Sequence, residues 1–172
     1  MSEKDLEQTI DTRCVQAGYT PGDGEPRQIP IVQSTTFKYD TSEHMGQLFD
    51  LEASGYFYTR LQNPTNDAVA AKICALEGGA AGMLTSSGQA ANFFALFNIC
   101  EAGSHIVASS AIYGGTYNLI AHTMAKMGIE STFVSPMCTD EELEAAFRPN
   151  TRAVFGETIA NPALDVLDIE RF

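Results

Sequence analysis

The sequence is poor in basic residues. Ten lysines and arginines stand against 22 aspartates and glutamates, which gives a formal net charge of −12. A field of that sign repels nucleic acid and anionic membrane surfaces, so we expect neither as a partner. Any phosphate ligand must then be held by local hydrogen-bond donors, because the overall charge of the protein opposes its binding.

Cysteines are also few, and they stand far apart. Cys14, Cys74, Cys100 and Cys138 form no CxxC motif and no Cys/His cluster, so we expect neither a structural zinc site nor a disulfide framework. Cys74 and Cys100 fall within apolar helical patterns. We interpret both as core residues, because free cysteine packs as a small hydrophobic side chain.

Long hydrophobic runs are missing as well. No stretch of 18 apolar residues is present, so no membrane span is predicted. The polar, acidic residues 1–5 lack the basic start and apolar run of a signal peptide, which favours a cytoplasmic location. With 172 residues, 44% of them hydrophobic and 19% charged, the sequence predicts a soluble globular protein with a real core.

The chain divides into two parts by its pattern. Residues 1–62 contain turn-forming segments and little periodic apolar sequence, with short helices expected around residues 6–14 and 41–51, and we interpret them as an arm that packs on another subunit. From residue 63 onward, strands and helices alternate. The predicted helices cover residues 64–77, 88–100, 115–127 and 139–147, and the predicted strands cover residues 81–85, 105–109, 129–134 and 151–157.

This alternation predicts an α/β fold, a mostly parallel sheet with helices on both faces. Residues 168–172 look like the first turn of a further helix. We therefore expect the chain to be the front part of a longer protein.

The first candidate site is the segment from Leu84 to Ala91, where a predicted strand ends, two serines and a glycine turn the chain, and a helix begins. The first amides of a helix lack internal partners, and the helix dipole adds partial positive charge there. A phosphate can bind such a turn without nearby basic side chains. The alternative is an ordinary capped helix.

Three further segments carry residues that could bind a ligand. Tyr58 and Arg60, two apart in a segment expected to be extended, can present a phenol and a guanidinium on one side, which suits a phosphate; the alternative is an arm arginine paired with a carboxylate. Tyr113 precedes two glycines and can stack on an aromatic ligand, or pack on its own helix. Glu157 and Asn161 follow the last strand, where α/β proteins bind ligands; the alternatives are a carboxylate satisfied by amides and a plain turn former.

In their order and spacing these segments resemble the cystathionine γ-synthase-like family of pyridoxal 5'-phosphate (PLP) enzymes, which have the fold-type I, aspartate aminotransferase-like architecture. The O-acetylhomoserine sulfhydrylase branch is the most similar, especially around residues 24–27 and 147–151. The matching segments are Gln33-Ser34-Thr35-Thr36-Phe37, Tyr58-Thr59-Arg60, Asn63-Pro64-Thr65, Ser86-Ser87-Gly88-Gln89-Ala90-Ala91, Tyr113-Gly114-Gly115-Thr116 and Glu157 with Asn161-Pro162.

The resemblance implies a role for each candidate residue. The serine turn holds the PLP phosphate, and Tyr58 and Arg60 reach the phosphate of a neighbouring subunit. Tyr113 stacks on the pyridine ring and takes part in proton transfer. The implied cofactor-binding residues are Tyr58, Arg60, Ser87, Gly88, Gln89, Tyr113, Glu157 and Asn161, of which Tyr113 is also catalytic.

The implied reaction is γ-replacement on O-acetyl-L-homoserine by sulfide or a thiol, giving homocysteine or methionine and acetate. The implied assembly is a homotetramer of dimers that share active sites. Residues 1–62 would be the arm and residues 63–172 the incomplete PLP-binding domain. Cystathionine γ-synthase or lyase activity remains an alternative, whereas methionine γ-lyase is disfavoured because Gly115 stands where those enzymes usually have cysteine.

The sequence departs from the family in its lysines. Lys4, Lys38, Lys72 and Lys126 do not follow the Ser/Thr-rich segment in which the family's PLP-binding lysine lies. We interpret Lys72 and Lys126 as solvated surface residues. The isolated chain is therefore expected to be inactive, and a non-catalytic truncated fragment remains an alternative.

Overall fold

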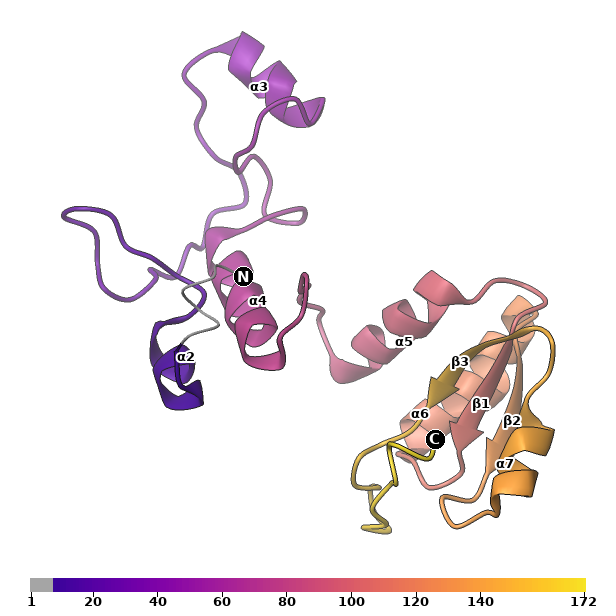
Figure 1. Ribbon diagram of the computed structural model, residues 1–172. Coiled ribbons are helices and arrows are strands. Elements are labelled where there is room, and N and C mark those ends of the chain that lie inside the picture. The colour runs from indigo at the N-terminus through magenta and orange to yellow at the C-terminus, as the bar shows by residue number, and fades with distance from the viewer. Residues whose placement is uncertain (1–7) are drawn as a thin grey trace. The chain divides into compact units, whose positions relative to one another are not determined.

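The computed structural model describes residues 8–172, and the chain divides into two compact units, Met1–Leu84 and Thr85–Phe172 (Figure 1). The first unit contains α2 (Ile10–Gln16), α3 (Ser42–Phe49) and α4 (Pro64–Glu77). The bounds of α4 agree with the prediction from sequence. Asn63 caps its first turn by accepting the Thr65 amide, Pro64 occupies its first position, and Gly78 ends it in the left-handed conformation at φ 67°.

Helices α2 and α4 are joined by two basic side chains. Arg13 Nη1 donates to the carbonyl of Ala75 at 2.9 Å, and Lys72 Nζ donates to the carbonyls of Cys14 and Val15 at 3.1 and 3.3 Å. The prediction that Lys72 is merely solvated was wrong. Its ammonium group satisfies carbonyls at the end of α2, which have no partner within that helix, and it complements the negative end of the helix dipole.

The extended segment around Val32 is fastened to the start of α4. Asn63 Nδ2 donates to the Val32 carbonyl at 3.0 Å, and the Val32 amide donates to Thr65 Oγ1 at 2.9 Å. Few apolar residues are buried in this unit, and both hydrophobic core clusters of the described residues lie in the second unit. This agrees with the low periodic apolar content of residues 1–62. Their role as an arm that contacts another subunit stays a prediction.

The second unit is built on three parallel strands in the order β2-β1-β3. Along the chain, α5 (Gly88–Ile99) precedes β1 (His105–Ser109), and α7 (Asp140–Ala146) connects β2 (Glu130–Val134) to β3 (Thr151–Phe155). The β1–β2 crossover begins with a loop at residues 110–113 and continues as three consecutive helical segments. These segments are α6 (Gly114–Asn118), a π-helical segment η1 (Leu119–Met124) and a 3₁₀ turn η2 (Ala125–Met127). The predicted α/β class is confirmed.

One predicted strand is absent. Residues 81–85 contain no strand, and most of them are exposed. A short apolar run can form a strand only when a neighbouring strand accepts its hydrogen bonds. The part of the chain that the structure describes offers no such neighbour, so its sheet has three strands instead of four.

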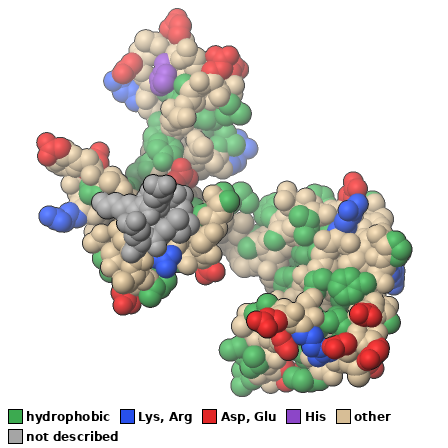
Figure 2. Space-filling model, in the orientation of Figure 1, with side chains coloured by type: hydrophobic (Ala, Val, Ile, Leu, Met, Phe, Trp, Pro, Cys, Tyr) green, Lys and Arg blue, Asp and Glu red, His purple; other side chains and the backbone are tan. Residues whose placement is uncertain are grey.

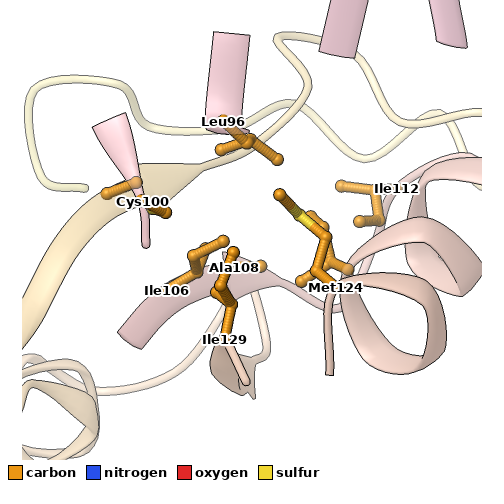
Figure 3. Packing of buried hydrophobic residues seen from close by; sticks show 9 residues of the cluster. Leu96, Cys100, Ile106, Ala108, Ile112, Met124 and Ile129 are labelled. Carbon is orange, nitrogen blue, oxygen red and sulfur yellow. The ribbon is translucent and has the colours of Figure 1, made fainter. Parts of the chain in front are cut away.

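Strand β1 contributes to both hydrophobic clusters. Ile106 and Ala108 point to one face, where they pack with residues of α5 and η1 (Figure 3). Val107 points to the other face, where it packs with Leu143 of α7. Because side chains alternate along a strand, a strand covered by helices on both sides is buried at every position, as β1 is. Cys100 lies in this core as predicted, whereas Cys74 is only half-buried.

His105 is fully buried at the start of β1. Its Nδ1 lies 2.8 Å from Thr151 Oγ1 and its Nε2 lies 2.9 Å from Thr132 Oγ1, so the ring links β3 to β2. Burial lowers the pKa of His105, the charge of Arg148 lowers it further, and Glu130 opposes the shift. The folded state therefore favours the neutral imidazole.

This burial predicts a loss of stability in mild acid. As the pH falls below about 6.5, the unfolded chain gains a proton on this histidine that the folded chain takes up only at lower pH. We expect the urea midpoint, followed by circular dichroism, to fall between pH 7.5 and 5.5, and to fall less in His105→Gln. The matched control is His122→Gln, which changes an exposed histidine. An equal pH dependence in His105→Gln and the unmodified chain would contradict this expectation.

Candidate functional site

The first part of the candidate site is the phosphate turn, residues 86–89. Ser87 adopts an extended conformation (φ −163°, ψ 160°), and its Oγ accepts the amide of Ala90 at 3.1 Å. The next two amides toward the N-terminus, those of Gly88 and Gln89, have no acceptor among the described residues. Gly88 is exposed, and a Cβ built there meets no atom within 4 Å. The turn therefore presents two helix-start amides to an open space, as an anion requires.

The side chain of Gln89 is already engaged in another contact. Its Nε2 donates to Thr116 Oγ1 at 2.9 Å, and Asn92 Nδ2 donates to the same oxygen at 3.2 Å. Gln89 is therefore able to offer a phosphate its backbone amide and not its side chain. Sequence reasoning missed Thr116 and Asn92, because no local pattern reports a contact between two helices.

Glu157 joins two loops at the carboxyl end of the sheet. Its Oε1 accepts the amide of Tyr113 at 2.9 Å and its Oε2 accepts the amide of Asn161 at 3.2 Å. The alternative considered from the sequence, a carboxylate satisfied by nearby amides, describes this arrangement. Glu157 holds the loop after β1 and the loop after β3 together, which brings Tyr113 and Asn161 to one region at the carboxyl ends of these two strands.

The ring of Tyr113 lies over Gly115 and is 47% exposed. A Cβ added at Gly115 would stand 2.5 Å from Cε1 of this ring. Any side chain at that position would force the tyrosine to move, so glycine is what allows the ring to adopt this position. The exposed face of the ring is free to stack on a flat ligand.

Tyr58 and Arg60 belong to the first unit, whereas the other candidate residues belong to the second. The Arg60 guanidinium carbon lies 5.1 Å from the centroid of the Tyr58 ring. The two side chains thus lie close to each other, as expected. The backbone between them forms a turn, in which the Leu61 amide donates to the Tyr58 carbonyl, instead of the expected extended segment. Among residues 8–172 no carboxylate pairs with Arg60, so the alternative of an arm ion pair finds no support there.

The described lysines do not approach the phosphate turn through any hydrogen bond. Lys38 pairs with Asp40 at 3.3 Å, Lys72 binds the end of α2, and Lys126 is exposed in η2. Lys4 lies outside the described residues. Within residues 8–172 no group of His, Cys, Asp and Glu side chains could hold a metal ion, and no described helix is both long and apolar enough to cross a membrane.

Curated relatives match nearly the whole chain. O-acetyl-L-homoserine sulfhydrylase of Corynebacterium glutamicum is 46% identical over 161 residues, which are 93% of this chain and 37% of that protein. The protein of that name from Leptospira meyeri is 47% identical over 143 residues, covering 83% of this chain and 32% of its own length. L-methionine gamma-lyase of Fusobacterium nucleatum subsp. polymorphum is 41% identical and covers 94% of this chain and 40% of itself. The chain thus spans well under half the length of these relatives.

Solved structures agree with these matches. An O-acetylhomoserine (thiol)-lyase from Campylobacter jejuni, which carries N'-pyridoxyl-lysine-5'-monophosphate at its position 205, superposes with a TM-score of 0.87 at 33% identity, covering 96% of this chain and 40% of that one. MetB from Corynebacterium glutamicum gives a TM-score of 0.86 at 38% identity, covering 97% and 42%. The family model described as Cys/Met metabolism PLP-dependent enzyme matches residues 11–172. The fold of this chain thus matches about 40% of the length of those structures. The chain therefore belongs to the Cys/Met metabolism family of PLP-dependent enzymes.

Proposed function

We propose that this chain supplies the cofactor-holding front part of an enzyme that performs γ-replacement on O-acetyl-L-homoserine with sulfide or a thiol. The observation that carries the proposal is the pair of amides of Gly88 and Gln89 at the start of α5, for which residues 8–172 offer no acceptor. They lie in the same unit as the exposed ring of Tyr113. The similarity to O-acetyl-L-homoserine sulfhydrylases at 46 and 47% identity supports the choice of substrate.

The residues present fit the phosphate and the ring of PLP. The amides of Gly88 and Gln89 suit the phosphate, and the exposed ring of Tyr113 suits the pyridine. Asn161 lies near Tyr113, because the carboxylate of Glu157 accepts the backbone amides of both residues. When bound, PLP stores the electrons released as protons leave the substrate carbons. Tyr113 would hold the ring by stacking and its phenol would move a proton, with its backbone fixed by the Glu157 carboxylate.

The remaining parts of the active centre are assigned to other polypeptide segments. The described lysines are engaged elsewhere or exposed, so the proposal places the lysine that binds PLP in the portion of the relatives' length that this chain does not span. Tyr58 and Arg60 would reach the phosphate of a neighbouring copy, with dimers pairing into a tetramer. The absence of a carboxylate partner for Arg60 among the described residues supports an anionic partner for it.

Exposed apolar side chains support the proposal of a partner copy. On α4, Val69 and Ile73 are 43% and 51% exposed and stand four residues apart, so they lie on one side of the helix. Figure 2 shows hydrophobic side chains at the surface of both units. Burial of such side chains between subunits is favourable, because it removes apolar area from water.

A chimera tests the proposed function. Residues 1–172 are joined to the C-terminal part of the Corynebacterium glutamicum sulfhydrylase that this chain does not cover, and the product is assayed for homocysteine formed from O-acetylhomoserine and sulfide. We expect sulfide-dependent turnover in the chimera and none in the isolated chain. A chimera that binds PLP but only cleaves methionine, or only processes cystathionine, would replace the proposed reaction with that of the alternative family members.

The carboxylate that joins the two loops gives a further prediction. In the active chimera, Glu157→Ala leaves the amides of Tyr113 and Asn161 without their common acceptor. Misplacement of a catalytic group by about 1 Å can cost roughly 100-fold, so we expect turnover to fall roughly 10- to 100-fold. The matched control is Glu144→Ala, an exposed carboxylate of α7 that should leave turnover unchanged. Steady-state rates at saturating PLP measure the effect, and equal rates for both variants would rule out a positioning role for Glu157.

A further inference from the structure

Thr116 lies at the meeting point of two helices and is 1% exposed. Its Oγ1 accepts hydrogen bonds from Gln89 Nε2 at 2.9 Å and from Asn92 Nδ2 at 3.2 Å. A hydroxyl oxygen has two lone pairs, so both are used by α5. A buried polar atom with this many specific partners fixes a geometry and does more than fill space.

The first turn of α5 places no side chain in the hydrophobic clusters of the described residues. The buried apolar side chain of the helix, Leu96, comes eight residues after Gly88, and the next, Cys100, follows its last turn. In the first turn Gly88 and Ala91 are exposed. Within residues 8–172, Gln89 and Asn92 are the α5 side chains that form hydrogen bonds outside their own helix. Core packing thus involves the end of α5, whereas the hydrogen bonds to Thr116 lie nearer its beginning.

Thr116 is also hydrogen-bonded to Tyr113, at the end of the loop after β1. The Thr116 amide donates to the carbonyl of Tyr113 at 2.9 Å, while the amide of Tyr113 donates to Glu157. An unbroken set of hydrogen bonds thus runs from the loop after β3, through Glu157 and Tyr113, to Thr116 and the first turn of α5. It connects the segment with the free amides to the segment with the exposed ring.

We propose that Thr116 is a positioning residue that sets the phosphate turn at a fixed place relative to Tyr113. The two parts of the site would then form one rigid frame for a ligand with an anionic group at one end and an aromatic ring at the other. The identity of that ligand as PLP rests on the proposed function, but the rigidity of the frame does not.

Hydrogen exchange in the 172-residue chain tests the rigidity. Thr116→Val keeps the shape and removes the acceptor, whereas Thr116→Ser keeps the hydroxyl. We expect the backbone amides of Ala91 and Phe93 to exchange about 10-fold faster in the valine variant and near the normal rate in the serine variant, with the amides of β1 unchanged. Unchanged exchange at Ala91 and Phe93 in a valine variant whose β1 stays protected would overturn the proposal.

A second variant covers the case in which the valine variant does not fold. Gln89→Ala combined with Asn92→Ala removes the donors from the surface of α5 and leaves the buried threonine in place. It is expected to accelerate exchange at Ala91 and Phe93 by the same factor. If this folded double variant exchanges like the unmodified chain, the contact does not hold the helix and the proposal is wrong.

The chimera tests the consequence for the cofactor. We expect the Kd for PLP to rise about 10-fold in Thr116→Val and to recover in Thr116→Ser. An unchanged Kd in the valine variant would overturn the positioning role for PLP. If the unmodified chimera itself fails to bind PLP, the proposed function fails, and the exchange experiment alone decides whether Thr116 fixes the frame.

Discussion

Replacing Gly88 with proline is expected to weaken PLP binding by the chimera roughly 10- to 100-fold without unfolding the protein. Gly88 is the first residue of α5, and its amide has no acceptor among the described residues. Proline removes that N–H group. A hydrogen bond to a charged group contributes about 1.5–3 kcal/mol, which sets the expected loss.

The substitution is well tolerated for conformational reasons. Proline is favoured at the first position of a helix, where its fixed φ suits the helix. The residue before a proline favours an extended conformation, and Ser87 already has one, with φ −163° and ψ 160°. A Cβ at position 88 meets no atom within 4 Å, so there is room for a side chain. A loss of affinity would therefore report on the missing amide.

The matched control is Gly88→Ala, which adds a Cβ in the same open space and keeps the N–H group. PLP titration followed by absorbance should give a Kd near that of the unmodified chimera for alanine and a much larger one for proline. Equal affinities of the two variants would show that this amide does not bind the phosphate. Circular dichroism of both variants checks that α5 is retained.

Ile106→Ala is expected to destabilise the second unit by about 2–5 kcal/mol, the usual range for removing a large aliphatic side chain from a core. Ile106 is fully buried in the central strand β1, where it packs with residues from α5 and η1 (Figure 3). Helices on both sides of the strand restrict its collapse into the cavity. Such a loss is a large fraction of the stability of an ordinary domain.

Ile169→Ala is the matched control, because it makes the same substitution at a residue that is 64% exposed. Its cost should stay below about 1 kcal/mol. Urea unfolding of the isolated chain measures both values. A similar midpoint shift in the two variants would mean that the cluster around Ile106 does not dominate the stability of this unit.

Local signals in the sequence were sufficient for most helices and strands. Pro64 and Gly78 mark the two ends of α4, and a capping box of Thr139 with Glu142 marks the start of α7. The predicted ranges 64–77 and 139–147 agree with these two helices to within one residue at each end. The predicted strand at residues 81–85 failed because a strand also needs a neighbour, and an apolar run carries no information about one. The π-helical η1 was likewise outside the reach of an amphipathic pattern.

The site residues that could be predicted from the sequence are those at the ends of helices and strands. Ser87, Gly88 and Tyr113 lie at element ends, which sequence patterns locate well. Contacts between distant residues were not predictable. Lys72 is separated from Cys14 by 58 positions and Gln89 from Thr116 by 27, and the geometry that joins them arises only when the helices pack.

The carboxylate of Glu157 also has a consequence for hybrids made by joining this gene to that of a homologue. Because one side chain accepts amides from the loops after β1 and β3, the position of each loop depends on the other, although 44 positions separate Tyr113 from Glu157. A crossover between two homologous genes that falls within this interval inherits the loops from different parents. Such a hybrid should keep the two loops in place only when the parent that supplies the loop after β3 has a carboxylate at the position of Glu157.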